Sequence, residues 1–387
     1  MQEQKSEIES GSPFQHTLVS RFLVVWLFLA FCGTLYLNFS KPSQAQEGEV
    51  QIVRLAERMA VVAQYTRDMQ PEIKRELLKT ALSLETDEQA KSIISGTLPD
   101  SLDLDTLSPV YRLLAEDLLG ANPQASEELQ RLATEGRQRF LLSLSLLSSL
   151  GLFAIVTFFL PSIADSEPPE TTDLDGFTVL GVFFAWHVFG FIGVGLFVGL
   201  MSSSVDEFFM ILLAQGLTYL WMLALLSQAR LRRNSSPFRA FSWSWIGKGY
   251  ALSILAVVGV NSVISALSGE APRSENPILG LFVDAPGWKY VMLGLLVVVV
   301  GPIFEEIMFR GWLFGGLRKG WGDQAAYLLS ATLFALIHGD APALPALFLL
   351  GLIFAWVYRR SGSLYTSILV HGMWNATTFS LLLSVMP

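Results

Sequence analysis

Long apolar runs separated by short polar stretches make up most of this chain. Nine of them have the roughly 16–24 residues that a helix needs to cross a bilayer. They cover residues 20–38, 140–160, 177–200, 208–226, 249–268, 289–310, 325–341, 343–358 and 363–385. Because 325–341 and 343–358 are short and nearly adjacent, either eight or nine crossings fit this pattern. It predicts an all-α, polytopic membrane helical bundle of about eight or nine transmembrane helices.

Residues 41–139 depart from this pattern because they are polar and contain few glycines. Leu78, Ala81 and Leu82 recur at helical spacing, and Asn122-Pro123 indicates a break between helices. We therefore expect a small α-helical extramembrane domain at 41–139. No catalytic spacing is evident in it, which leaves a partner-binding role, a regulatory role or a plain spacer as its interpretation.

The first apolar run is expected to be an anchor helix that follows an N-terminal tail, together residues 1–40. Ser43-Gln44-Ala45 could instead be the cleavage site of a signal peptide, but the run is long for such a signal. Residues 140–286 would then hold transmembrane helices two to five, and 287–387 would hold the remaining helices.

The composition supports a membrane protein. Of the 387 residues, 52% are hydrophobic and 16% are charged, whereas soluble domains carry about 25% charged residues. A net charge of −8 does not suggest a nucleic-acid partner. The single cysteine, Cys32, excludes a disulfide or a cysteine-based metal site within one chain.

The orientation follows from Lys and Arg in the short loops. With nine spans, three basic loops fall on one side, which should be the cytoplasm, and the 41–139 domain lies opposite. The acidic loop 161–176 also falls on the cytoplasmic side, but acids have little influence on orientation. The basic residues of the three loops are Arg230, Arg232, Arg233, Arg239 and Lys248, then Arg318 and Lys319, then Arg359 and Arg360.

Several ionisable side chains lie inside the most apolar third of the chain. A charged group near the centre of a membrane helix costs roughly 2.5–3.5 kcal/mol on insertion scales, so such groups are usually functional. They suggest an intramembrane active site. They form three groups: Glu305, Glu306 and Arg310; Phe334 and His338; and His371 and Asn375.

The three groups are expected at a similar depth. Glu305 precedes Arg318 by 13 residues, and His371 follows Arg360 by 11 residues. His338 follows Asp323 by 15 residues. At about 1.5 Å per residue, each group lies roughly 16–23 Å from the same face of the bundle.

The local spacing indicates different roles for the two carboxylates. Glu306 and Arg310 are four residues apart on one helix, so they can pair and hold the site together. Glu305 points about 100° away and is free to act as a general base on water. Gly301-Pro302 precedes them by one turn, and the proline should kink the helix and open space for water.

The histidines complete a site for water-activated acyl hydrolysis. His338 could share a water with Glu305. Asn375 lies one turn after His371 on the same helix face, and the two side chains could donate hydrogen bonds to an oxyanion. No serine or cysteine nucleophile is evident in the pattern.

These motifs resemble those of a known family. The stretch from Glu305 to Gly311 is similar to the EExxxR motif of the CAAX prenyl endopeptidase and bacteriocin-processing (CPBP, Abi-like) family of intramembrane proteases. Phe334 to His338 is similar to its FxxxH motif, and His371 to Asn375 to its HxxxN motif. The resemblance covers roughly residues 287–380 and identifies 287–387 as a CPBP-type peptidase core.

The resemblance implies a glutamate-dependent protease without a cofactor. In such a protease, Glu305 would activate a water with help from His338, and His371 and Asn375 would stabilise the oxyanion. Glu306 and Arg310 support the site. The alternative is a zinc protease that uses Glu305, His338 and His371 as ligands with an open fourth position.

Two non-catalytic classes remain open. Intramembrane Glu, Arg and His also occur in proton-coupled transporters, although no repeated halves are visible here. An immunity or scaffold protein could keep the fold without turnover. As an enzyme, the protein would cleave a membrane-embedded or lipidated peptide or protein substrate within the lipid bilayer. We expect a bacterial plasma membrane, or an organelle membrane of bacterial origin.

Overall fold

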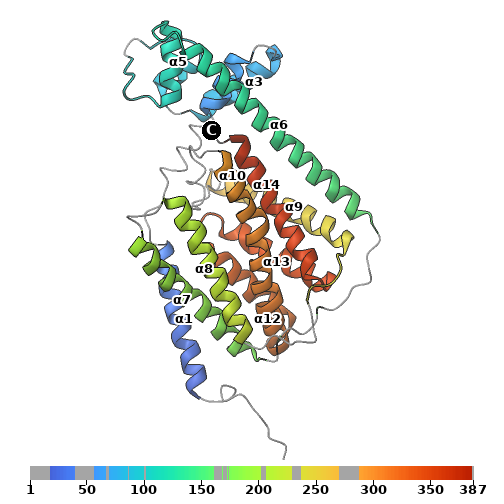
Figure 1. Cartoon of the computed structure of the whole chain (residues 1–387). Coiled ribbons are helices and arrows are strands. Elements are labelled where there is room, and N and C mark those ends of the chain that lie inside the picture. The colour runs from blue at the N-terminus through green and yellow to red at the C-terminus, as the bar shows by residue number, and fades with distance from the viewer. Residues whose placement is uncertain are drawn as a thin grey trace, which may run out of the picture.

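The computed structural model of the chain is built almost entirely of helices (Figure 1). It describes residues 18–39, 56–66, 69–85, 87–99, 102–160, 174–201, 206–228, 237–269 and 287–385, together with residues 168 and 172. Arg230, Arg232 and Arg233 of the first expected basic loop lie outside the described residues.

The bundle contains seven uninterrupted helices among the described residues and one longer, interrupted run. All nine predicted apolar runs are helical, which confirms the all-α membrane fold class. The uninterrupted helices are α1 (Leu18–Phe39), α6 (Ala125–Phe158), α7 (Gly176–Met201), α8 (Glu207–Gln228), α9 (Trp243–Ser268), α13 (Leu344–Ser361) and α14 (Leu364–Val385).

The interrupted run carries the carboxylates. It consists of α10 (Gly287–Leu295), the π-helix η2 (Leu296–Val300), α11 (Gly301–Glu306), the π-helix η3 (Ile307–Phe314) and α12 (Gly315–Ile337). α12 is broken at Gly322, whose φ of 84° is open mainly to glycine. This break lies between the predicted runs 289–310 and 325–341.

Among the described residues, six helices are long and apolar enough to cross a membrane. One of them is the whole 51-residue stretch Gly287–Ile337, which contains two of the predicted runs. Arg21–Leu37 forms a shorter apolar helix. The chain is therefore an integral multi-pass membrane protein, and the count of eight or nine crossings stays a prediction.

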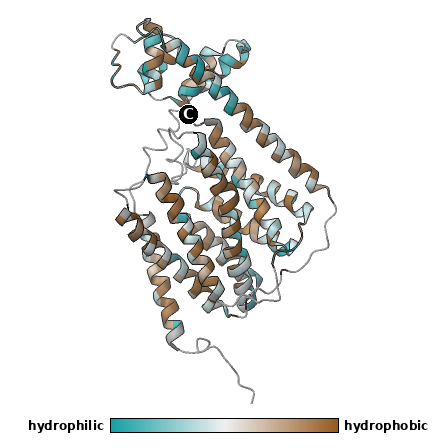
Figure 2. Cartoon of the chain, in the orientation of Figure 1, coloured by the Kyte–Doolittle hydropathy of each residue, from teal (hydrophilic) through white to brown (hydrophobic). Residues whose placement is uncertain are grey.

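A small helical unit with its own apolar core lies at one end of the bundle (Figure 1). It contains a helix over residues 56–65, α3 (Pro71–Leu84), α4 (Glu88–Ile94), α5 (Pro109–Leu119) and the beginning of α6. Asp87 caps α4 through two backbone N–H groups, and Ser108 caps α5. The unit is more polar than the bundle (Figure 2).

The expected domain boundary at 139/140 falls inside helix α6, which continues for 34 residues without a break. Its first half packs in the helical unit, and its second half runs along the bundle beside α9 and α14 (Figure 1). At Gly247 of α9, a side-chain Cβ would lie 2.4 Å from the backbone nitrogen of Phe158. α6 therefore joins the unit directly to the bundle.

The three expected basic loops meet at the opposite end of the bundle. Asp323 accepts hydrogen bonds from Arg318 Nε at 2.9 Å and from Arg359 Nε at 3.2 Å. Ser363 Oγ donates to the carbonyl of Arg239 at 2.7 Å. These contacts confirm that the loops share one face, and its assignment to the cytoplasm stays a prediction.

Candidate active site

The two carboxylates lie on a short α-helical turn between two π-helical segments. Pro302 stands in the first turn of α11, where its missing N–H and its ring favour a change in the helix. The N–H of Gly301 donates to the carbonyl of Leu296, five residues earlier. At Gly301-Pro302, where a kink was expected, the helix is thus widened into the π turn η2, and the second π-helix η3 begins after Glu306. Such π turns are often found at functional sites.

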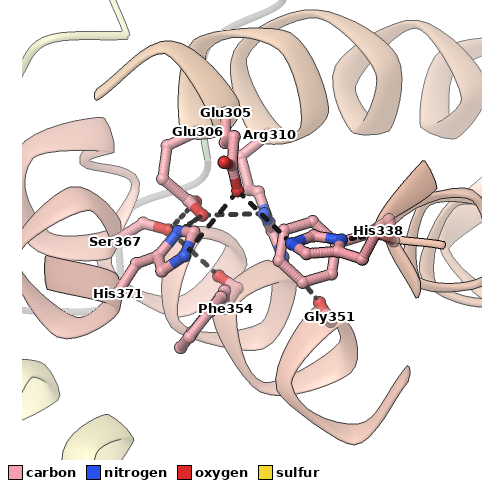
Figure 3. A network of polar contacts seen from close by, with 9 residues as sticks. Glu305, Glu306, Arg310, His338, Gly351, Phe354, Ser367 and His371 are labelled. Carbon is pink, nitrogen blue, oxygen red and sulfur yellow. Dashed lines mark hydrogen bonds and ion pairs between the residues drawn. The ribbon is translucent and has the colours of Figure 1, made fainter. Parts of the chain in front are cut away.

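Glu306 is the centre of a buried polar network (Figure 3). Its Oε1 lies 2.7 Å from Arg310 Nη1 and 3.0 Å from His371 Nδ1, and its Oε2 accepts from the Ser367 hydroxyl. Arg310 Nη2 also donates to the carbonyl of Gly351 at 3.1 Å. The predicted Glu306–Arg310 pair is present, and it connects three helices.

Aromatic rings enclose this network. The guanidinium carbon of Arg310 lies 4.7 Å from the ring centre of Phe334 and 5.3 Å from that of Phe354. The His371 ring stacks on Phe354 at 4.6 Å. Such contacts stabilise a cation where water is excluded, and they fix the plane of the imidazole.

His338 has a defined tautomer when it is neutral. Its Nδ1 lies 2.6 Å from the carbonyl oxygen of Phe334, one turn earlier. Because a carbonyl oxygen can only accept, Nδ1 carries the hydrogen and Nε2 carries the lone pair. This bond gives a physical reason for the four-residue spacing between Phe334 and His338.

Both imidazoles face the same carboxylate oxygen. Glu305 Oε2 lies 3.9 Å from His338 Nε2 and 3.8 Å from His371 Nε2. Since His371 Nδ1 donates to the Glu306 carboxylate, its Nε2 is also the atom free to face Glu305. The structure thus brings together Glu305 from α11, His338 from the end of α12 and His371 from α14.

The two glutamates and the two histidines differ in how far their side chains are exposed. Glu306 and His371 side chains are 0% and 3% exposed, whereas Glu305 and His338 are 26% and 23% exposed. Glu305 Oε2 is buried and has no hydrogen-bond partner among the described residues. A small polar molecule beside it would satisfy this oxygen.

Asn375 lies one turn after His371, as predicted, but its amide has a backbone partner. Its Nδ2 donates to the carbonyl of Val297 in η2 at 2.9 Å. Close by, a Cβ on Gly372 would lie 2.9 Å from the carbonyl of Val298. Asn375 therefore ties α14 to the π turn before the carboxylates, with one further amide N–H available.

A zinc ion would need tighter grouping of its ligands. Tetrahedral zinc, with bonds of about 2.0–2.1 Å, places its ligand atoms about 3.3 Å apart. The distances from Glu305 to the two imidazoles are 3.8 and 3.9 Å. Among the described residues, no group of three or more His, Cys, Asp or Glu is placed to hold a metal ion.

Two further side chains, Ser367 and Phe354, belong to the site but were not predicted from the sequence. Ser367, His371 and Asn375 follow one another at four-residue intervals on α14, so the serine was visible as a third polar residue on that face. Phe354 had no such indication, because its contact with His371 depends on how α13 and α14 pack.

Residues 287–377 match the family model described as "Type II CAAX prenyl endopeptidase Rce1-like". This segment contains all six predicted site residues. No solved structure matches the chain significantly.

Curated bacterial relatives match over part of their length. The putative membrane peptidase YdiL of Bacillus subtilis (strain 168) is 28% identical over 159 residues, which are 41% of this chain and 62% of the relative. The membrane-embedded CAAX protease MroQ of Staphylococcus aureus (strain USA300) is 28% identical over 137 residues, 34% of this chain and 54% of the relative.

A third relative, the UPF0177 protein YbdI of Lactococcus lactis subsp. lactis (strain IL1403), is 35% identical over 108 residues. These are 26% of this chain and 54% of the relative. The chain thus spans 54 to 62% of the length of the three relatives. Residues 287–377, which carry the three motifs, are thus similar to the Type II CAAX prenyl endopeptidase Rce1-like family.

Proposed function

We propose that this protein is an intramembrane endopeptidase that hydrolyses peptide bonds with a water activated by Glu305. The observation that carries the proposal is the position of Glu305 Oε2. It is buried, has no hydrogen-bond partner among the described residues, and faces two imidazole nitrogens. A water beside this oxygen would contact the Glu305 carboxylate, which can act as a base, and the Nε2 atoms of both histidines.

In the proposed reaction, Glu305 takes a proton from the water while the water oxygen bonds to the peptide carbonyl carbon. His338, held by Phe334, orients this water through Nε2. The carbonyl oxygen becomes an oxyanion, which the second amide N–H of Asn375 stabilises together with His371, whose ring must then carry a hydrogen on Nε2 as well as on Nδ1. The carbon–nitrogen bond then breaks, and the amine leaves with the proton that Glu305 held.

Glu306 and Arg310 are supporting residues in this mechanism. Glu306 already accepts from Arg310, Ser367 and His371, so its lone pairs are engaged. Its carboxylate orients the His371 ring so that Nε2 faces Glu305. Since Glu306 is fully buried, a substrate reaches Glu305 first.

The substrate proposed is a membrane-embedded or lipidated peptide or protein. The site lies between apolar helices, so a substrate must enter from the bilayer or from a membrane face. The name of the Staphylococcus aureus relative, membrane-embedded CAAX protease, supports this class.

The alternative mechanism is a zinc-dependent peptidase with Glu305, His338 and His371 as ligands. In its favour, each of the three residues offers a lone pair toward a common point. Against it, the ligand atoms are farther apart than tetrahedral zinc requires. A strong chelator distinguishes the two mechanisms.

The test compares membranes that contain wild-type protein with membranes that contain Glu305→Ala or Asn261→Ala, a polar residue of another span. Quantitative proteomics of membrane and lipidated proteins would follow uncut and cut forms. We expect uncut substrates to accumulate with Glu305→Ala alone. Unchanged cleavage products at normal folded yield would instead favour an immunity or scaffold protein or a proton-coupled transporter.

A further inference from the structure

Tyr219 brings a hydroxyl group to the site from a helix outside the family match. It lies on α8, and its ring stacks on the ring of Phe304 at 4.3 Å with an angle of 5° between the planes. Phe304 directly precedes Glu305 in the chain. Tyr219 is 7% exposed, so the stacking fixes the direction of a buried phenol.

Gly301 separates this phenol from the carboxylate. A Cβ on Gly301 would lie 3.6 Å from Tyr219 Oη and 3.6 Å from Glu305 Oε1. It would also lie 3.2 Å from the carbonyl oxygen of Leu296. Three oxygen atoms thus surround the side of Gly301 that carries no side chain, and a water held among them would have several polar partners.

The two oxygens of Glu305 therefore face different groups. Oε2 faces His338 and His371, whereas Oε1 lies beside Gly301, which the phenol of Tyr219 also approaches. Gln215, one turn earlier on α8, is a side-chain hydrogen-bond partner of the same phenol. When the amide of Gln215 donates to the phenol oxygen, the phenol hydrogen is free to donate toward Glu305.

We infer that Tyr219 is a positioning residue for Glu305, which it holds through one water seated beside Gly301. The phenol donates to the water, and the water donates to Glu305 Oε1. This keeps Oε2 turned toward the two imidazoles. Only the effect of Tyr219 on turnover rests on the proposed function. The water-mediated contact between Tyr219 and Glu305 belongs to the protein without substrate and can be tested there.

The contact is tested first without turnover, by infrared difference spectra of the purified protein in lipid nanodiscs. The carboxylate band of Glu305 is identified by its loss in Glu305→Gln. Tyr219→Phe keeps the stacked ring and removes only the hydroxyl. We expect it to shift the Glu305 band, and we expect Gly301→Ala, whose methyl group would displace the water, to shift the band in the same way.

Tyr358→Phe is the matched control. Tyr358 is a fully buried tyrosine of the same bundle, and its hydroxyl has no hydrogen-bond partner among the described residues. We expect Tyr358→Phe to leave the band unchanged. An unshifted band in Tyr219→Phe, or an equal shift in Tyr358→Phe, overturns the inference.

Turnover gives the second readout. On a substrate that wild-type protein cleaves, Tyr219→Phe should lower kcat about tenfold with KM unchanged, because the water that donates to the charged Glu305 carboxylate is no longer held. The double variant that combines Tyr219→Phe with Gly301→Ala should be no slower than the slower of the two single variants, because both substitutions remove the same water. Wild-type kcat in Tyr219→Phe contradicts the inference and leaves the proposed function standing, whereas failure of Glu305→Ala to reduce cleavage contradicts the proposed function.

Discussion

His371 donates its Nδ1–H to Glu306 Oε1 at 3.0 Å, across 65 positions of the sequence. This bond joins α14 to the turn that carries the two adjacent carboxylates, and it gives them different tasks. Glu306 is engaged by His371 and by Arg310 at 2.7 Å, with no exposed surface. Glu305 is partly exposed, and its Oε2 is left for a substrate or a water.

The first prediction concerns Glu306. Glu306→Gln should lower the folded yield and the unfolding temperature, because it leaves the buried Arg310 guanidinium without its counter-charge. Removing one partner of a buried ion pair typically costs about 3–5 kcal/mol. Thermal unfolding in detergent, followed by size-exclusion chromatography, measures the effect.

The control for this prediction is Glu76→Gln in α3. Glu76 lies 3.9 Å from Lys79, and both side chains are well exposed, so the change should be within about 1 kcal/mol. If Glu306→Gln keeps the wild-type unfolding temperature and loses activity, Glu306 belongs with the catalytic residues.

The second prediction concerns His338. His338→Gln should lower kcat by about 10²–10⁴-fold, the usual range for a group that assists proton transfer, with little change in unfolding temperature. Kinetics on a cleaved peptide in nanodiscs provide the measurement.

His187→Gln is the matched control for His338. His187 is a buried histidine of α7 whose ring contacts Phe31 at 5.0 Å. We expect it to affect stability and to leave kcat per folded molecule unchanged. Equal losses of kcat in both variants would mean that His338 acts only through packing.

Part of this site could be predicted from the sequence because it follows from helical spacing. The Glu306–Arg310 pair and the Phe334–His338 bond are both contacts between residues four apart on one helix. The common depth of Glu305, His338 and His371 followed from their distance to basic loops. The helices that meet at the site are long apolar runs, which are the clearest pattern in a membrane protein.

Other parts depend on tertiary packing and had no pattern of their own. The π turn η2 is supported by the hydrogen bond from Asn375 to the Val297 carbonyl. The predicted boundary at 139/140 was placed where polarity changes, but α6 continues because its residues on both sides favour a helix. The Gly351 carbonyl that binds Arg310 is backbone, so no side-chain pattern reveals it.

The third prediction concerns the close contact between α12 and α13. A Cβ on Gly351 would lie 2.9 Å from Ala331 Cα, and the Gly351 carbonyl binds Arg310. Gly351→Ala should therefore push the helices apart and destabilise the fold by about 1–3 kcal/mol. Unfolding temperature in detergent is the readout.

Gly259→Ala in α9 is the matched substitution. Nothing lies within 4 Å of its Cβ position among the described residues, so the variant should be neutral or more stable through better helix propensity. If Gly351→Ala unfolds at the wild-type temperature, the packing of α13 on α12 is looser than described.

The fourth prediction concerns orientation in the membrane. In a Cys32→Ser background, Lys319→Cys lies at the end with the basic loops, and Ile73→Cys lies in the helical unit at the other end (Figure 1). A membrane-impermeant maleimide added outside intact cells should label the cysteine at 73 and leave the one at 319 unlabelled until the membrane is opened. The reverse pattern would invert the topology.

The central claim is that Glu305 activates the hydrolytic water without a metal. The most direct test measures the cleavage rate of one identified substrate by purified wild type and Glu305→Gln in nanodiscs, each with and without a strong zinc chelator. We predict full wild-type activity in the chelator and a loss of at least about 10²-fold in the variant. Wild-type activity abolished by the chelator and restored by added zinc would contradict the claim, as would a Glu305→Gln variant that cleaves at the wild-type rate.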